Sequence, residues 1–378
     1  GLAAPTGKAA ARLTEAVHDA AARLPLDLAA DLTGVQAVTV HRLLEARSGV
    51  RRTFRYNRRH PLPQHVVIVD ETSMLSLPLT ARLLEALSPD ARLVLVGDPA
   101  QLGSVEAGSV LADVARSSQR DLAACRAELV HSRRYPPGSP LDRLAGAVRA
   151  GDADGAVAAL HSPSTSSAVA GTVRWIDRPA PDAADDIRRL VEPAALATVD
   201  HAVAGESHAA IESLANMRLL CAHRRGPYGV EQWNRHVETW LHADGVATAG
   251  WYAGRPVMVT ANDHRLQLFN GDTGVVVAGL RPLVAFAGAG DVRLVSPAAL
   301  DAVDTVHATT IHKSQGSEFD EVVVIAPPAS SRLATRELLY TAITRARRTV
   351  TVVGTADAIR AAVARPTERT TGLPTRLH

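Results

Sequence analysis

The sequence predicts an α/β protein built on parallel sheets, and two observations support this. Five short apolar runs, rich in Val, Leu and Ile and without polar alternation, are each bounded by turn signals, as is typical of parallel strands covered on both faces. Ala/Leu/Arg stretches with helical spacing lie between them, which favours strands alternating with helices. The runs are HVVIVDE (65–71), RLVLVGDP (92–99), MRLLCAH (217–223), DEVVVIAP (320–327) and TVTVVGT (349–355).

The composition is that of a globular protein of two or three domains. The chain has 378 residues, enough for two or three domains, and its 46% hydrophobic and 21% charged residues are ordinary for a globular protein. No apolar run approaches the ~18 residues of a membrane span. Cys125 and Cys221 are too few for a disulfide framework or a metal cluster. We therefore expect a cytoplasmic protein, and the net charge of +2 does not by itself indicate a nucleic-acid partner.

Two segments interrupt the alternation of strands and helices. Residues 47–64 are Arg-rich, carry Phe54 and Tyr56, and predict a small inserted hairpin. Residues 251–303 contain short strands joined by Asn-Gly and Gly-rich turns, which predict a small β-barrel insertion. The segment 161–210 has weak periodicity, so we expect peripheral loops and helices there.

Carboxylates follow the first apolar run, in VVIVDETS. Asp70 and Glu71 stand at the C-terminal end of a buried strand, where ligands bind in open α/β sheets. In an NTPase of this design the Asp holds the water shell of Mg²⁺, and the Glu orients or deprotonates the attacking water. The same residues also suit a turn that caps a helix, so this motif alone does not decide between a nucleotide site and a helix cap.

The next apolar run ends in a second polar motif, GDPAQL. Gln101 at that strand end could reach a γ-phosphate or its attacking water. A plain Gly-Asp-Pro turn is the alternative. Two strand ends that carry DE and GDxxQ favour a nucleotide site over two unrelated turns.

The opening decapeptide GLAAPTGKAA is similar to a phosphate-binding loop. The full pattern is G-x-x-x-x-G-K-[ST], in which the backbone N–H groups and the Lys bind phosphate and the hydroxyl holds Mg²⁺. That pattern would need a glycine where Leu2 stands and a hydroxyl where Ala9 stands. The decapeptide is therefore not a phosphate loop, and no other stretch of the chain supplies the pattern.

A family resemblance rests on motifs in their order. VDETS, GDPAQL, HSRRY, IHKSQGSEFDEVVVI and LLYTAITRARRTVTVVG follow the order and spacing of motifs II to VI of superfamily 1 DNA helicases. With LLCAHRRGPYGVEQWN and WYAGRPVMVTANDHRLQLFNGDTGVV, the chain resembles the RecD family, the alpha subunits of exodeoxyribonuclease V, over essentially its whole length.

The resemblance implies a domain organisation. It implies two RecA-like P-loop NTPase domains, 1–125 with the hairpin insertion and 126–378 with an SH3-like β-barrel at 251–303. In the family the phosphate loop precedes the segment APTGKAA, which is motif Ia. The resemblance therefore implies an N-terminally truncated member whose first domain lacks its phosphate loop, and we expect no ATPase activity from these 378 residues alone.

The resemblance also implies roles for individual residues. Asp70 would hold Mg²⁺ and Glu71 would activate the attacking water. The γ-phosphate would be sensed and stabilised by Gln101, Arg134 and Arg345, the last acting as an arginine finger. Gly316 and Glu318 would approach the nucleotide, Glu318 accepting from the ribose hydroxyl. If motif VI stood alone, Arg345 and Arg347 would suit a solvated helix end. The DNA-contacting residues would be Pro5, Thr6, Lys8, Thr39, His41, Phe54, Tyr56, Thr310, His312, Lys313 and Ser314, of which Phe54 and Tyr56 lie on the strand-splitting hairpin.

The resemblance implies an ATP- and Mg²⁺-dependent 5′→3′ helicase that acts on single-stranded DNA and duplex ends. It would assemble with the beta and gamma subunits of exodeoxyribonuclease V, away from membranes. Two rival classes stay open: a free-standing RecD-like or relaxase-associated helicase, and a non-catalytic DNA-binding scaffold. A scaffold has no chemical use for the residues that would act on a nucleotide, which are Asp70, Glu71, Gln101, Arg134 and Arg345.

Overall fold

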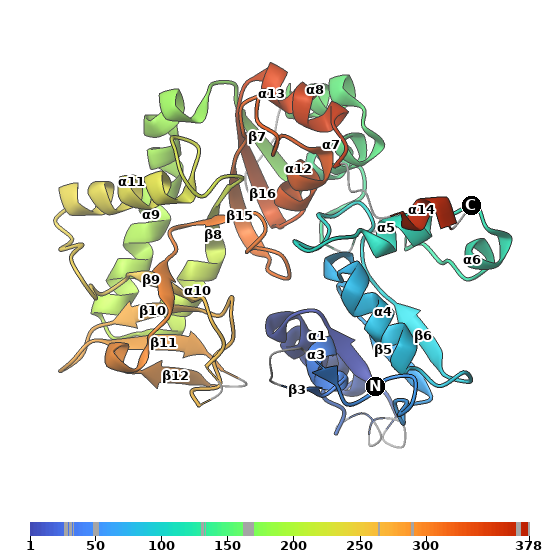
Figure 1. Cartoon of the computed structure of the whole chain (residues 1–378). Coiled ribbons are helices and arrows are strands. Elements are labelled where there is room, and N and C mark those ends of the chain that lie inside the picture. Colours follow the sequence, from blue (N-terminus) through green and yellow to red (C-terminus); the bar gives the residue numbers. More distant parts are fainter. Residues whose placement is uncertain are drawn as a thin grey trace. The chain divides into compact units, whose positions relative to one another are not determined.

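The structure is a computed structural model, and it describes residues 1–25, 29, 32, 34–47, 53–129, 132, 134–161, 170–263, 265–288, 291–367 and 372–376. The chain divides into two compact units (Figure 1). The first unit comprises Gly1–Glu128 with Glu368–His378, and the second comprises Leu129–Thr367. Among the described helices, none combines the length and apolar character needed to cross a membrane.

A four-stranded parallel sheet forms the centre of the first unit, in the order β2-β1-β5-β6. β5 and β6 are the apolar runs at 65–71 and 92–99, so their prediction as parallel strands is confirmed. β1 and β2 have only three and two residues, and the apolar pattern does not predict them. The strands are β1 (Leu2–Ala4), β2 (Val38–Thr39), β5 (Val66–Val69) and β6 (Arg92–Leu95).

Hydroxyl-bearing residues begin three helices of the first unit. Thr6, Thr39 and Ser76 accept a hydrogen bond from a backbone N–H of the first helical turn, which satisfies a donor that the helix itself leaves unpaired. The first unit contains α1 (Gly7–Ala21), α3 (Val40–Leu43), η1 (Thr72–Met74), α4 (Leu77–Ala86), α5 (Val110–Arg116), α6 (Arg120–Ala124) and α14 (Leu373–Arg376).

A short antiparallel pair lies within the predicted hairpin region of the first unit. β3 (Ala46–Arg47) pairs with β4 (Thr53–Phe54), with Ala46 opposite Phe54. The connecting residues 48–52, which include Arg51 and Arg52, lie outside the described residues.

A five-stranded parallel sheet forms the centre of the second unit, in the order β14-β8-β15-β16-β7. The other three apolar runs are its three central strands, as predicted. Helices cover both faces of this sheet (Figure 1), which explains the uninterrupted apolar character of those strands. The strands are β7 (Thr172–Ile176), β8 (Met217–Cys221), β14 (Ala308–Thr310), β15 (Phe319–Ile325) and β16 (Ala346–Val353).

The segment 161–210 differs from its prediction in two respects. It contains β7 as well as helices, and it is not peripheral, because Ile187 and Val191 lie in the apolar core of the second unit. β7 is an edge strand and is only partly buried, so it tolerates Arg174 and Trp175 and lacks an apolar run. The helices of the second unit are α7 (Pro140–Ala150), α8 (Ala153–His161), η2 (Ala180–Ala183), α9 (Ala184–Val203), α10 (Ser207–Asn216), α11 (Val230–Ala243), α12 (Arg336–Ile343) and α13 (Ala356–Ala364).

The predicted β insertion of the second unit is an antiparallel sheet in the order β12-β11-β10-β9-β13. Val275 and Val277 on one face pack with Ala202 of α9 and Ala210 of α10. Its edge strands β12 and β13 do not pair with each other among the described residues, so a closed barrel is not seen. The elements are β9 (Pro256–Val259), β10 (Thr273–Val277), β11 (Leu283–Ala287), β12 (Val292–Val295), η3 (Pro297–Ala299) and β13 (Val303–Thr305).

Candidate functional site

The strand ends of the first unit are tied together at the edge where Asp70 and Glu71 stand. Thr72, directly after them, donates to the Val96 carbonyl at the end of β6 through both its backbone N–H (3.0 Å) and its hydroxyl (2.8 Å). The backbone N–H of Asp70 donates to Ala3 of β1 at 2.9 Å. Because β1, β5 and β6 are parallel neighbours, the motifs that follow them share one edge of the sheet.

Asp70 and Glu71 are half-buried and locally ordered. The Glu71 backbone N–H donates to Asp70 Oδ1 at 2.8 Å. Glu71 adopts the left-handed conformation, with φ 50° and ψ 39°. That conformation is uncommon for a residue other than Gly, Asn or Asp, and such strain is concentrated at functional positions.

Gln101 has a buried acceptor for which the described residues provide no donor. Asp98 orders its turn, accepting from the Ala100 N–H at 2.9 Å and from Gln101 Nε2 at 3.4 Å. Gln101 Oε1 is buried and has no hydrogen-bond partner in the part of the chain that the structure describes. A buried acceptor left unpaired is costly, so this oxygen is suited to accept from a bound O–H group such as a water molecule.

The predicted motif Ia and the turn at Thr39 lie side by side in the first unit. β1 and β2 are paired in register, with Ala4 opposite Thr39. The hydroxyls of Thr6 and Thr39 each accept from a helix N–H at 3.2 Å, which fixes the turns on which Pro5, Lys8 and His41 stand. Helix N-termini at a strand edge are suited to bind phosphate groups, although α3 has only four residues.

The aromatic residues of the hairpin region are half-buried. Phe54 and Tyr56 pack against the apolar core of the first unit. Tyr56 stacks on His60 with ring centroids 5.3 Å apart, and Phe54 lies 6.2 Å from His41. Phe54 and Tyr56 therefore contribute to packing, and their contact with DNA stays a prediction.

Three arginines of the second unit lie at or next to Glu318. Arg134 pairs through Nη2 with Glu318 Oε1, and its Nη1 donates to the Thr344 carbonyl at 2.7 Å. Arg347 Nε donates to Glu318 Oε2 at 3.2 Å. Arg345 is 2% exposed and donates to the carbonyls of Thr341 (3.1 Å) and Ser317 (3.3 Å). Arg347 lies on β16, so its interpretation as part of a solvated helix end is wrong, and its charge partner was not identifiable from the sequence.

The turn between β14 and β15 carries the other predicted contacts. Gly316 has a φ of +69°, which favours glycine. Ser314 is 1% exposed and its hydroxyl donates to the Ile311 carbonyl at 2.8 Å, so the hydroxyl serves the turn itself. The Thr310 hydroxyl accepts from the Lys313 N–H at 3.2 Å, and Lys313 Nζ lies 3.1 Å from Asp304 Oδ2 on β13. His312 is half-buried.

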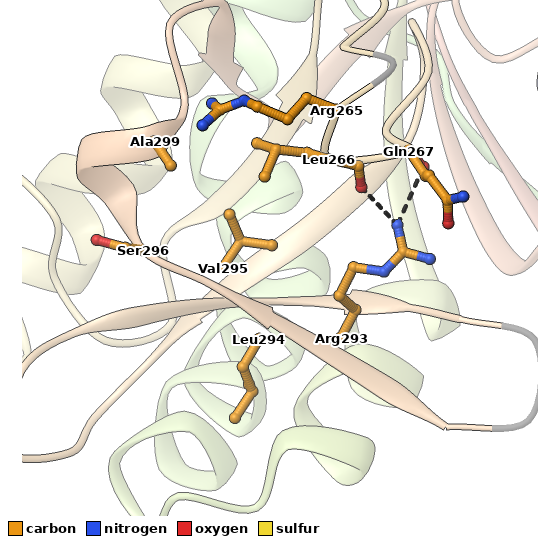
Figure 2. Close-up of a pocket in the computed structure, with 8 residues that line it drawn as sticks. All are labelled: Arg265, Leu266, Gln267, Arg293, Leu294, Val295, Ser296 and Ala299. Carbon is orange, nitrogen blue, oxygen red and sulfur yellow. Dashed lines mark hydrogen bonds between the residues drawn. The ribbon is translucent and has the colours of Figure 1, made fainter.

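A separate pocket of about 490 Å³ lies on the antiparallel sheet. Arg293 lies along it and donates to the carbonyls of Leu266 (2.7 Å) and Gln267 (3.1 Å), as Figure 2 shows. None of the predicted site residues lines this pocket, so it is distinct from the clusters above. Its lining residues are Arg265, Leu266, Gln267, Arg293, Leu294, Val295, Ser296 and Ala299.

Two protein-family models match the chain. The AAA domain matches residues 1–171, which cover the strand ends of Asp70 and Gln101. The UvrD-like helicase C-terminal domain matches residues 305–353, which cover the turn of Gly316 and the Glu318 cluster. Among solved structures, the crystal structure of Pif1 helicase from Candida albicans is similar with a TM-score of 0.46 and 16% identity, over 96% of this chain and 91% of that one.

Curated relatives match over the whole chain. RecBCD enzyme subunit RecD of Mycolicibacterium smegmatis is 49% identical over 100% of this chain and 65% of the relative. The RecD subunit of Mycobacterium tuberculosis is 50% identical over 100% of this chain and 64% of the relative. The ATP-dependent RecD2 DNA helicase of Deinococcus radiodurans is 33% identical over 100% of this chain and 46% of the relative. The chain thus spans about two thirds of the RecD subunits that it matches, and it belongs to the RecD family.

Proposed function

We propose that this chain is the motor part of an ATP-dependent DNA helicase that moves 5′→3′ along single-stranded DNA. The observation that carries the proposal is the shared edge of β1, β5 and β6, where Thr72 ties the Asp70–Glu71 strand end to the one that leads to Gln101. In this proposal the two RecA-like domains are residues 1–125 and 126–378, and the β insertion is a barrel of SH3 type. The identity to RecD subunits supports the whole assignment.

The residues of the first unit fit a magnesium nucleotide. Among the described residues, no three His, Cys, Asp or Glu side chains gather as a metal cage. Mg²⁺ is commonly held by one or two carboxylates together with waters and substrate phosphates, so a single aspartate at a strand end suffices. When bound, MgATP supplies the phosphoryl group whose transfer to water releases the energy for movement.

Within this proposal each residue has one task. Asp70 holds the water shell of the ion, and Glu71 orients the attacking water and accepts its proton. The unpaired Oε1 of Gln101 accepts a hydrogen bond from that water. Arg134 and Arg345 donate to the γ-phosphate oxygens, where negative charge spreads as the bond breaks. Glu318 and Gly316 position the nucleotide.

We propose that the DNA lies along the strand-end turns of each unit. In the first unit these are the turns of Pro5, Thr6 and Lys8 and of Thr39 and His41, with Phe54 and Tyr56 on the strand-splitting hairpin. In the second unit it is the turn of Thr310, His312 and Ser314. The proposed partners are the beta and gamma subunits of exodeoxyribonuclease V. The names of the relatives, which call each of them a subunit of the RecBCD enzyme, support assembly with other subunits.

The test is ATPase activity stimulated by single-stranded DNA, measured on the full-length gene product and on variants of it. Glu71→Gln removes the proton acceptor and should lower kcat by at least about a hundredfold. Glu15→Gln is the matched control, because Glu15 is an exposed glutamate on α1 of the same unit. DNA substrates with 5′ or 3′ overhangs check the polarity. Equal activity of Glu71→Gln and wild type would overturn the proposal.

A further inference from the structure

Thr72 makes two hydrogen bonds to one carbonyl group at the end of β6. Its backbone N–H donates to the Val96 carbonyl at 3.0 Å, and its hydroxyl donates to the same oxygen at 2.8 Å. The Val96 N–H in turn donates to the Val69 carbonyl at 2.8 Å, so Thr72 continues the pairing of β5 and β6 beyond the ends of both strands. Thr72 is 2% exposed, so both of its bonds are largely shielded from solvent.

Glu71 lies between two residues that are fixed to different neighbouring strands. The Asp70 N–H donates to the Ala3 carbonyl of β1 at 2.9 Å, whereas Thr72 is bonded to the end of β6. Glu71 itself adopts the left-handed conformation, with φ 50° and ψ 39°. A residue other than glycine keeps this conformation only where the surrounding structure holds it. The anchors on either side therefore fix the Glu71 backbone and the direction in which its side chain leaves it.

The Thr72 hydroxyl is the part of this anchor that a substitution can remove alone. The free energy of one hydrogen bond is similar in size to the strain of one left-handed residue, so the loss of the hydroxyl bond is enough to shift the turn toward relaxed conformations. The backbone bond to Val96 would remain and keep the strand ends paired. The Glu71 carboxylate would then point in the reactive direction for a smaller fraction of the time, and a misplaced proton acceptor slows the reaction.

We infer that Thr72 is a positioning residue, whose hydroxyl holds the left-handed backbone of Glu71 and so directs the Glu71 carboxylate toward the attacking water. The inference rests on the proposed function, because Glu71 is the proposed proton acceptor. Thr72 is buried and contacts neither the nucleotide nor the water in this scheme. It acts on the rate of the chemical step through Glu71.

The experiment compares kcat and KM for ATP of the full-length gene product in the presence of single-stranded DNA. Thr72→Val removes the hydroxyl but keeps the shape of the side chain and the backbone bond. It should lower kcat about fivefold, the size expected when one hydrogen bond no longer favours the reactive conformation, with KM within about twofold of wild type. Thr72→Ser restores the hydroxyl and should recover kcat to within about twofold of wild type.

Thr80→Val is the matched control for the loss of a buried hydroxyl. Thr80 is 4% exposed and lies on α4 of the same unit. Its backbone N–H and its hydroxyl both donate to the Ser76 carbonyl at 2.9 Å, so Thr80→Val removes the same kind of bond within a helix instead of at the strand end. It should leave kcat within about twofold of wild type. An equal loss of kcat in Thr80→Val and Thr72→Val would mean that both act through stability, and it would overturn the inference.

A double-variant cycle tests whether Thr72 acts through Glu71. In a Glu71→Gln background, Thr72→Val should lower the residual kcat by less than about twofold, because the proton acceptor is already absent. A loss of about fivefold in that background would overturn the inference, as would a wild-type kcat for Thr72→Val or a loss that Thr72→Ser does not recover. A wild-type protein without DNA-stimulated ATPase would instead overturn the proposed function.

Discussion

The left-handed backbone of Glu71 predicts a conflict between stability and activity. A non-glycine residue with φ 50° and ψ 39° is strained by about 1–2 kcal/mol, which glycine would relieve. This relief is partly offset, because glycine has more conformational freedom in the unfolded chain, which lowers the free energy of unfolding by about 0.4–1 kcal/mol. Glu71→Gly should therefore stabilise the first unit by about 0.5–1 kcal/mol relative to Glu71→Ala, and both variants should lose ATPase activity.

Amide hydrogen exchange is the assay, because all four tryptophans lie in the second unit and their fluorescence reports on that unit. The reporters are the Ile68 and Val96 N–H groups, which donate to Gly1 and Val69 at 2.8 Å within the sheet. A gain of 0.5–1 kcal/mol corresponds to exchange slowed by about two- to fivefold. Faster exchange in Glu71→Gly than in Glu71→Ala would refute the argument from strain.

Three further predictions concern packing, pH and DNA affinity. A Cβ on Gly97 would lie 2.8 Å from Thr72 Oγ1 and 2.9 Å from Leu111 Cδ2, so Gly97→Ala should destabilise the first unit by about 1–3 kcal/mol in the same exchange assay. Gly34→Ala, with nothing within 4 Å of its Cβ, is the control, and equal exchange in the two variants would contradict the prediction. Burial, then Arg218 and Arg255, lower the pKa of His307 from 6.5 to about 3. Between pH 6.5 and about pH 3, His307 binds a proton in the unfolded chain but not in the folded chain. The free energy of unfolding of the second unit should therefore fall by about 1–2 kcal/mol between pH 7.5 and pH 5. His307→Gln should reduce that loss in urea unfolding followed by tryptophan fluorescence, and an unchanged loss would show that other groups carry it. Asp304→Asn releases Lys313 for a DNA phosphate and should tighten binding of single-stranded DNA about two- to threefold, which is the range of a surface ion pair. Asp301→Asn, an exposed neighbour, should leave the affinity unchanged, and weaker binding by Asp304→Asn would mean that Asp304 orients Lys313 instead of competing with DNA.

The sequence predicts the strands with long apolar runs well, and it predicts β1, β2 and β7 poorly. The apolar parts of β8, β15 and β16 are buried, and burial on both faces is what makes a strand visible as a continuous apolar run. β5 and β6 show the same kind of run although Val66 and Val94 are exposed. β1 is the tripeptide Leu2–Ala4 and β2 has two residues, so neither is long enough to show a pattern. β7 contains Arg174 because an edge strand has one side without a neighbour.

The candidate site was predictable as a set of strand ends, and its local chemistry was not. Spacing alone places Asp70, Glu71 and Gln101 after strands that the apolar pattern identifies. The backbone strain of Glu71 and the unpaired Oε1 of Gln101 depend on how the turns pack against each other. The partnership of Arg347 with Glu318 joins residues 29 positions apart in sequence, and no local pattern indicates it.

Arg134 and Arg345 are both assigned to the γ-phosphate by their motifs, but they would lose different hydrogen-bond partners if they moved. Arg345 is buried and donates to two neutral carbonyls, so its departure would leave buried acceptors unpaired at about 1–3 kcal/mol each. Arg134 is partly exposed and pairs with a carboxylate, so a phosphate would replace one anion by another. The energy difference therefore favours Arg134 as the guanidinium that moves to the nucleotide. Arg345 is better suited to act from the position that it already holds.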